Sequence, residues 1–435
     1  MFQRKKSYHM KRSAFLRTCC TGVAGAVVLP HLSFAAASPR PASGWPVVDP
    51  SDERFWTLLR DQFPLTRERA YLNTGGLGAS PYVVIDTVKG KMDELEHMCE
   101  TGHSEEALLE IKVTAAGLLG ADPTELAFTR NTTEGINIVA AGVDWKKGDE
   151  VILSTHEHVG NSMTWMALTR SHGIVIRLFE PSTASAAENL SRIEKITTKR
   201  TRMISIPHVV TTTGLRLPVK EICAFARSRG ILNLVDGAQT AGMFPFSLHE
   251  IGCDAYATSG HKWLMGPKET GLLYVRKDMF GTFTPRFVGA YSDGGYDFLK
   301  GEMAFNPTAQ RYEYGTVSMP LRHGLGAAFQ FIQRIGIENT WARDRALSSR
   351  LAEGLRALPH VRVLSPEDPT LSSAMTTFMH DRLPYLELQK QLTERNLRTR
   401  GVNEGGLAAL RISTHIYNTV DEVDRVLEGV RAAKF

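Results

Sequence analysis

Apolar and polar positions alternate along the middle of the chain in a regular rhythm. Short apolar runs, typical of strands, are separated by stretches in which apolar residues recur at helical spacing. The run 231–235 (ILNLV) is almost wholly apolar, as a strand buried on both faces of a parallel sheet would be. The predicted strands cover 125–129, 150–154, 174–179, 202–206, 231–235, 255–258 and 271–275, and helices are predicted over 134–143, 162–170 and 219–228.

This rhythm predicts an α/β fold whose large domain holds a seven-stranded, mostly parallel sheet covered by helices. Upstream, helical patterns lie near 53–62 and over 83–100. After about residue 340 the pattern changes, which predicts a smaller α+β domain. The boundaries that follow are 53–335 for the large domain and 336–435 for the small one. Within the small domain we expect a helix over 339–358, strands over 361–364, 373–379 and 409–413, and a last helix from about Val420, where Thr419 and Glu422 are spaced as a capping box.

The first 37 residues differ in composition from the rest of the chain. The net charge of the 435 residues is +5, yet residues 1–37 hold six Lys and Arg and no acid, so the remainder carries −1. The body of the protein therefore offers no general basic surface, and we expect no nucleic-acid partner. The apolar run 18–29 is too short to span a bilayer, and the small residues of segment 33–37 suit cleavage after Ala35 or Ala37.

These features indicate an export signal over 1–37 followed by a Pro- and Ser-rich linker over 38–52. The segment 11–17 (KRSAFLR) resembles a twin-arginine signal, although Lys11 replaces one arginine and one extra residue precedes Phe15. We expect export to the bacterial periplasm, with no membrane attachment after cleavage. Sec export, an uncleaved N-terminal anchor and a disordered tail are the alternatives.

Three cysteines, Cys99, Cys223 and Cys253, lie outside the leader. Their wide spacing fits neither a disulfide framework nor a metal site, and we expect no metal.

The strongest chemical signal is Lys262, which follows the predicted strand 255–258 between two glycine turns. A free lysine has a pKa of about 10.4, so it must be desolvated or converted to an imine before it acts near neutrality. A Schiff base with pyridoxal 5′-phosphate does this. The alternative is a surface lysine in a turn.

Three further signals follow predicted strands. Asp236 ends the apolar strand 231–235 and needs a cationic partner, which a protonated pyridine nitrogen would supply. The alternative for Asp236 is an ordinary helix N-cap. Gln239 could donate to the ring hydroxyl. The segment 130–135 opens a helix with hydroxyls and free N–H groups, which suits an anion. His158 could lie flat on a pyridine ring or be structural.

Four short motifs carry a family resemblance. Taken in chain order, Asn-Thr-Thr-Glu at 131–134, Glu-His at 157–158, Asp-Gly-Ala-Gln at 236–239 and Ser-Gly-His-Lys at 259–262 resemble those of class V aminotransferases, of pyridoxal-phosphate fold type I. The resemblance covers about residues 70 to 430. It implies pyridoxal 5′-phosphate as cofactor, an amino acid as substrate, and a homodimer with active sites at its interface.

The resemblance also implies roles for single residues. Lys262 forms the Schiff base and moves protons, Asp236 pairs with the pyridine nitrogen, and His158 stacks on the ring. Gln239 contacts the ring oxygen, and Arg411 binds the substrate carboxylate, for which a guanidinium is well suited. Phosphate contacts are implied for Thr132, Thr133, Ser259 and His261, and for Gly315 and Thr316 from the second subunit.

The reaction is less tightly specified than the cofactor. Cysteine desulfurases of this family need a mobile cysteine before the carboxylate-binding arginine, and segment 398–406 carries none. The chain looks closest to the isopenicillin N epimerase-like branch, so we expect an epimerase or an aminotransferase. A C–S lyase and a non-catalytic cofactor-binding protein stay open. Epimerisation needs a second acid or base, for which His208, Tyr291 and His323 are candidates.

Overall fold

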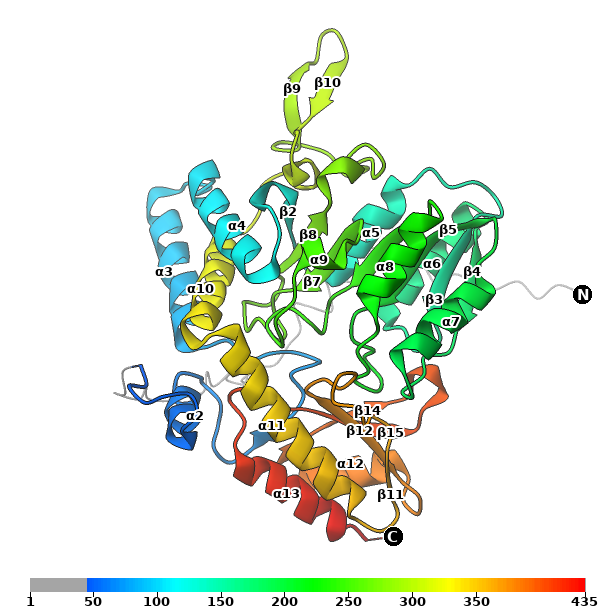
Figure 1. Ribbon diagram of the computed structural model, residues 1–435. Coiled ribbons are helices and arrows are strands. Elements are labelled where there is room, and N and C mark those ends of the chain that lie inside the picture. The colour runs from blue at the N-terminus through cyan, green and yellow to red at the C-terminus, as the bar shows by residue number, and fades with distance from the viewer. Residues whose placement is uncertain (1–44, 435) are drawn as a thin grey trace, which may run out of the picture. The chain divides into compact units, whose positions relative to one another are not determined.

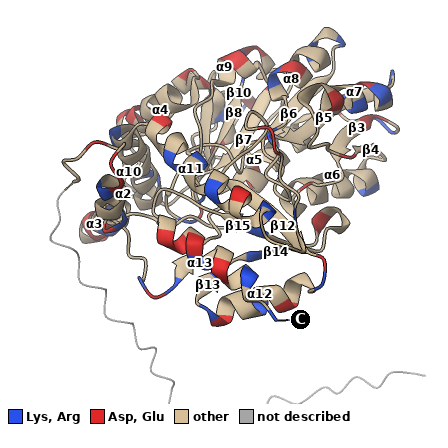
Figure 2. Ribbon diagram, turned by 60° about the horizontal axis from the view of Figure 1, so that its bottom comes forward, with Lys and Arg blue, Asp and Glu red and all other residues tan. Residues whose placement is uncertain are grey.

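The computed structural model describes residues 45–434. The predicted export signal and its cleavage site lie outside these residues, so export stays a prediction. Among the described helices, none is both long and apolar enough to cross a membrane. Blue and red segments are interspersed over the helices in Figure 2, among them α7 (Ala186–Ile196) and α13 (Val420–Arg431).

The large sheet has seven strands in the order β2-β8-β7-β6-β5-β3-β4. All neighbouring strands pair in parallel except where β8 is involved, since it runs antiparallel to both β2 and β7. The prediction of a mostly parallel, seven-stranded sheet is therefore confirmed. The strands are β2 (Leu126–Thr129), β3 (Glu150–Ser154), β4 (Val175–Phe179), β5 (Thr201–Pro207), β6 (Leu232–Asp236), β7 (Ala255–Ser259) and β8 (Gly271–Val275).

Helices cover both faces of this sheet because successive side chains of each strand point to opposite faces. In β6, Val235 packs with one set of helices, and its neighbour Leu234 packs with the other. The first set contains α4 (Glu105–Leu119), α7, α8 (Val219–Ser228), α9 (Leu248–Ile251) and α10 (Met319–Ile335), and the second contains α5 (Thr132–Gly142) and α6 (Val159–Ser171).

A smaller antiparallel sheet, with the order β11-β12-β15-β14, lies in the C-terminal part of the chain (Figure 1). The predicted capping box is present, because Thr419 and Glu422 bond each other's backbone N–H at the start of α13. The sheet and its helices are β11 (Val361–Val363), β12 (Met375–His380), β14 (Arg400–Val402), β15 (Ala409–Ser413), α11 (Ile337–Arg356), α12 (Tyr385–Glu394) and α13.

The segment from β1 (Ala70–Tyr71) to Gly78 joins the two sheets and passes the site. β1 pairs in parallel with β13 (Leu397–Arg398), and Asn73 bridges to Ser413 of β15. A few residues later, Gly78 N–H donates to the carbonyl of His261, at the end of the large sheet, over 2.8 Å. This segment therefore connects the end of β15 in the small sheet with the carboxyl end of β7 in the large one.

Several elements were not predicted, among them α4, α7, α10, α12 and β14. A hairpin of β9 (Asp293–Asp297) and β10 (Glu302–Phe305) projects from the large sheet in Figure 1. Its turn exposes Phe298 and Leu299, at 87% and 95% of their surface. The predicted helices near 53–62 and 83–100 are present as α2 (Glu53–Arg60) and α3 (Tyr82–Met98).

Candidate active site

The predicted site residues gather around one cavity of about 210 Å³ beyond the carboxyl ends of β3, β6 and β7. Parallel sheets place their ligands in this position. Of the residues singled out in the sequence, eight line it: Thr132, Thr133, His158, Asp236, Ser259, His261, Lys262 and Arg411. Gln239, Gly315 and Thr316 do not.

Lys262 is held by a tight turn after β7. Gly260 N–H donates to the Thr270 carbonyl at 2.7 Å, and Met265 N–H donates to the carbonyl of Lys262 at 3.0 Å. Only 9% of Lys262 is exposed, and burial lowers its pKa to about 8. Asp236 opposes this shift, whereas Arg411 and Arg400 add to it. An amine with this pKa can lose and regain a proton near neutrality.

Asp236 ends β6 as a buried acid, 7% exposed. Its Oδ1 accepts a hydrogen bond from Ala238 N–H at 2.9 Å, and among the described residues it forms no ion pair. Burial raises the pKa of Asp236, with the Ala238 bond and Lys262 opposing. A carboxylate placed in this way needs a cation, and a protonated pyridine nitrogen is such a group.

Hydroxyl groups and the first turn of α5 form one end of the cavity. Thr132 Oγ1 and Ser259 Oγ lie 2.7 Å apart, and Asn131 caps α5 by accepting from Glu134 N–H at 2.9 Å. The capping box that this spacing suggests is not formed, because the Glu134 carboxylate bonds Arg130 instead. The free N–H groups of the first turn and these hydroxyls suit a phosphate group.

The two histidines at the cavity are held neutral. His158 Nδ1 accepts from Gly160 N–H at 3.1 Å, so its proton resides on Nε2. Burial, helped by Lys262, lowers the pKa of His158 to about 4. His261 Nδ1 lies 3.2 Å from the carbonyl oxygen of Thr270 and donates to it, and burial lowers its pKa as well. Neither ring carries a charge at neutral pH.

Gln239 lies behind the wall of the cavity. Its Nε2 donates to the Gly75 carbonyl at 2.8 Å, and its Oε1 accepts from Trp263 Nε1 at 2.9 Å. It thereby ties the chain around Gly75 to the turn that carries Lys262. A contact between Gln239 and a ring oxygen stays a prediction.

Arg411, on β15, is 1% exposed. Its Nη1 donates to the carbonyl and the hydroxyl of Thr211, both at 2.8 Å, and its Nη2 donates to Asn73 Oδ1 at 3.3 Å. Its Nε is buried without a partner among the described residues. Burial lowers the pKa of Arg411 to about 9. The free Nε–H and the second hydrogen of Nη2 form one edge of the guanidinium, which suits a carboxylate.

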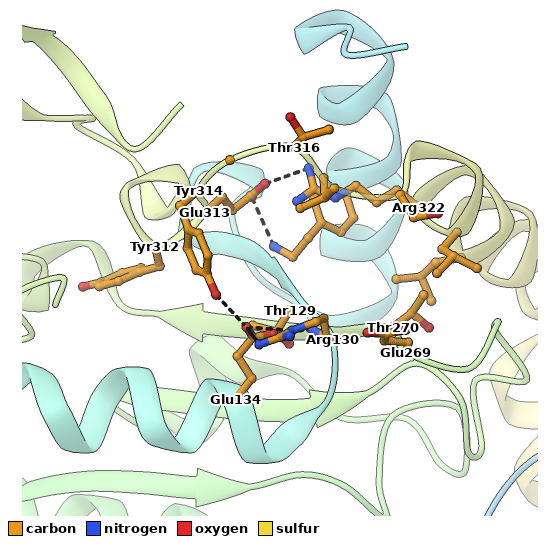
Figure 3. A pocket seen from close by; sticks show the side chains of 16 residues that line it. Thr129, Arg130, Glu134, Glu269, Thr270, Tyr312, Glu313, Tyr314, Thr316 and Arg322 are labelled. Carbon is orange, nitrogen blue, oxygen red and sulfur yellow. Dashed lines mark hydrogen bonds and ion pairs between the residues drawn. The ribbon is translucent and has the colours of Figure 1, made fainter. Parts of the chain in front are cut away.

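Gly315 and Thr316 line a different cavity, of about 380 Å³ (Figure 3). Its buried acid, Glu313, pairs with Lys112 at 2.7 Å and with Arg322 at 3.0 Å. No residue lines both this cavity and the one at Lys262. The family resemblance implies that Gly315 and Thr316 contact the phosphate of a second copy of the chain, and this stays a prediction.

The three candidates for a second acid or base lie away from the Lys262 cavity. His208 is buried against Phe244 and bonds Tyr256 Oη at 3.1 Å. Tyr291 is stacked on His103, with ring centroids 3.8 Å apart, and His323 lies on α10. Within the described chain, none of them reaches the site.

Two residues of this region carry no signal in the sequence patterns. Arg400 lines the cavity beside Arg411, and Glu404 forms an ion pair with Arg400. A strand predicted over 400–402 would have pointed to both, but the segment shows no apolar alternation.

Comparison with known proteins gives a consistent result. A family model described as aminotransferase class-V matches residues 88–426. An isopenicillin N epimerase of Amycolatopsis lactamdurans is 32% identical, with 86% of this chain and 98% of that protein covered. A probable cysteine desulfurase of Pyrococcus abyssi is 26% identical, with 85% and 95% covered. The structure of the cystine C–S lyase C-DES with its product cysteine persulfide superposes with a TM-score of 0.78 at 29% identity, covering 85% of this chain and 99% of that one.

The residues present fit pyridoxal 5′-phosphate, which C-DES carries in a second structure with glycine covalently linked to it. Lys262 would hold the aldehyde carbon, and the otherwise unpaired Asp236 would meet the ring nitrogen. Thr132 and Ser259, at the first turn of α5, would hold the phosphate, and the neutral ring of His158 would lie against the cofactor ring.

Proposed function

Because this chain belongs to the class-V aminotransferase family and its cofactor is pyridoxal 5′-phosphate, we propose that it moves the α-proton of an amino acid, as aminotransferases and epimerases do. The observation that carries the proposal is Lys262, buried at the cavity with a pKa of about 8 and accompanied there by Asp236 and Arg411. When bound, the cofactor draws electrons from the α-carbon of the amino acid, which weakens the bond to that proton.

Arg411 and Lys262 would have different roles in this reaction. Arg411 binds the α-carboxylate through its Nε and Nη2 edge, while Thr211 fixes the other side of the guanidinium. This orients the α-carbon toward Lys262 Nζ, which takes the proton and returns it. A non-catalytic cofactor carrier would have no use for a buried arginine of this kind, and for this reason we favour an enzyme.

The number of proton-moving groups separates the two reactions. An aminotransferase removes the α-proton and relocates it on one face only, so a single base such as Lys262 suffices. An epimerase needs a second group on the opposite face. Within the described chain, His158 and His261 are committed to other bonds, and the cavity geometry favours the aminotransferase. The epimerase relative supports the other reaction, whose second group would have to come from another copy of the chain in a homodimer.

A desulfurase that uses its own thiol is not supported. The segment before β15 is short, forms β13 and β14, and contains no cysteine. Cys223 and Cys253 are buried, and burial raises the pKa of both thiols. The likeness to C-DES keeps a C–S lyase as a second candidate, since that structure is of a cystine C–S lyase.

The experiment is incubation of the cofactor-loaded protein with L- and D-amino acids in D2O, with Lys262→Ala as the control. We expect α-deuterium uptake that the control lacks. Keto acid formation with an added keto acid acceptor would identify an aminotransferase, inversion without keto acid would identify an epimerase, and pyruvate from cystine would identify the lyase. Absence of deuterium uptake, keto acid and pyruvate with every amino acid would refute the proposal.

A further inference from the structure

Two arginines lie side by side on adjacent strands of the small sheet, at the cavity. β14 pairs antiparallel with β15, and the Cα of Arg400 lies directly opposite that of Arg411. Residues in this relation project from the same face of the sheet, and both arginines line the Lys262 cavity. Like charges directly opposite each other destabilise a sheet. Arg400 and Lys262 also repel the charge of Arg411 and of each other.

The free N–H groups of the two guanidiniums show what could offset this repulsion. Arg411 keeps an Nε and Nη2 edge free, which is enough to hold one carboxylate in a bidentate manner. Arg400 is therefore not needed for the α-carboxylate. Its Nη2 is paired with Glu404, but its Nη1 is buried with no partner in the described part of the chain. A buried, charged donor without an acceptor is costly.

Glu404 cannot readily swing to cover Nη1 as well. One of its carboxylate oxygens is paired with Arg400 Nη2, and the other accepts from Asn403 N–H at 3.2 Å, in a tight turn where Gly405 and Gly406 both have positive φ. The turn therefore fixes the Glu404 carboxylate on one side of Arg400 and leaves the other side for a ligand.

We propose that Arg400 binds a second carboxylate of the substrate, so that the enzyme acts on dicarboxylic amino acids. The inference rests on the proposed function, in which Arg411 already holds the α-carboxylate. Arg400 thus acts as a specificity-determining residue, and Glu404 holds its guanidinium while competing for it.

The test is an absorbance titration of the cofactor-loaded enzyme with aspartate, glutamate and 2-aminoadipate, each paired with an uncharged counterpart: asparagine, glutamine and norleucine. The variants are Arg400→Gln, Glu404→Gln and, as a matched control, Arg398→Gln. Arg398 lies on β13, which precedes β14 along the chain, donates to the Thr399 carbonyl at 2.7 Å and does not line the cavity. A charge-assisted hydrogen bond lost in Arg400→Gln corresponds to roughly 10- to 100-fold in affinity.

We expect the tightest dicarboxylic acid to bind better than its uncharged counterpart. Arg400→Gln should remove this preference without changing the affinity for the uncharged counterparts, and Arg398→Gln should change neither affinity. Glu404→Gln should strengthen dicarboxylate binding, because a competing carboxylate is gone. Equal binding of all charged and uncharged pairs by the unaltered enzyme would overturn the proposal, as would an equal loss for every ligand in Arg400→Gln. If no L- or D-amino acid changes the spectrum, the proposed function itself fails, which is a different result.

Discussion

Replacing Gly78 by Ala tests how firmly the turn that carries Lys262 is held. Gly78 is buried, and its N–H donates to the carbonyl of His261 at 2.8 Å. A methyl group at this position would lie 2.8 Å from the carbonyl carbon of Lys262 and closer still to its oxygen. The φ of Gly78 is not in the left-handed region, so the backbone accepts alanine and the effect is purely steric.

The magnitude follows from the distance that the turn must move. Ordinary contacts begin near 3.4 Å, so the Lys262 carbonyl carbon has to recede by about 0.6 Å, and the carbonyl oxygen, which is nearer to the methyl group, has to recede further. That movement strains the hydrogen bond from Met265 N–H to the Lys262 carbonyl, which is 3.0 Å long. Overpacking and the loss of about one backbone hydrogen bond together predict a decrease of roughly 2–4 kcal/mol in the free energy of unfolding.

The same displacement should lower the turnover of the cofactor-loaded protein. Misplacement of a reacting group by about 1 Å can lower a rate by about 100-fold, and we expect a loss of about 100-fold because the turn that carries Lys262 has to move by this order. The assays are urea denaturation and the turnover of the cofactor-loaded protein. Gly90→Ala is the matched control, because a methyl group there meets no atom within 4 Å and lies in the middle of α3. This control should gain up to about 1 kcal/mol from helix propensity.

If Gly78→Ala had the same unfolding free energy and turnover as the unaltered protein, the contact between Gly78 and the Lys262 turn would not matter. The account of how the turn is positioned would then be wrong.

Three further predictions concern the cavity. Without cofactor, Lys262→Met should raise the free energy of unfolding by roughly 3 kcal/mol at pH 7, because burial lowers the pKa of Lys262 from 10.5 to about 8. In the unaltered protein the loss of stability appears as the pH falls from 10.5 to 8. Equal unfolding free energies of the two proteins in a pH series of urea titrations would refute this prediction. Asp236→Asn should also stabilise the cofactor-free protein at pH 7, since burial raises the Asp236 pKa, yet lower turnover at least about 100-fold; equal turnover would contradict the ring contact. Thr132→Ala and Ser259→Ala should each weaken cofactor affinity by about 10-fold, measured by absorbance, and the double variant should lose less than the product because the two hydroxyls are bonded to each other.

Much of the large sheet and its chemistry could be predicted because each signal is local. An apolar run such as 231–235 reports burial on both faces, and an acid directly after it lies at the carboxyl end of the sheet. The same holds for Lys262 after β7 and for Thr132 after β2. Parallel strands bring their carboxyl ends to one edge, so separate local signals converge on a single cavity.

The features that could not be predicted depend on contacts between distant segments. Arg400 acquires its place from the register of β14 against β15, and a shift of one residue would turn its side chain to the other face. The bonds of the Gln239 amide to Gly75 and Trp263 likewise join distant segments, while its contact with a ring oxygen stays a prediction. The hairpin of β9 and β10 was missed because its residues are mostly exposed and show no alternation of buried and exposed positions.

Repulsion between the buried cations of the cavity therefore destabilises the ligand-free protein, and anionic ligands relieve it. Lys262 and Arg411 are both buried with lowered pKa values, and Arg400 has a buried donor without a partner. In the folded chain without ligands, these cations repel one another at low exposure to water. A phosphate and two carboxylates would each give the site an acceptor that the protein itself does not supply. A ligand present at about 1,000 times its dissociation constant stabilises a fold by about 4 kcal/mol. Anionic ligands that neutralise these cations remove the repulsion that destabilises the ligand-free chain, and this favours the binding of anionic amino acids over uncharged ones.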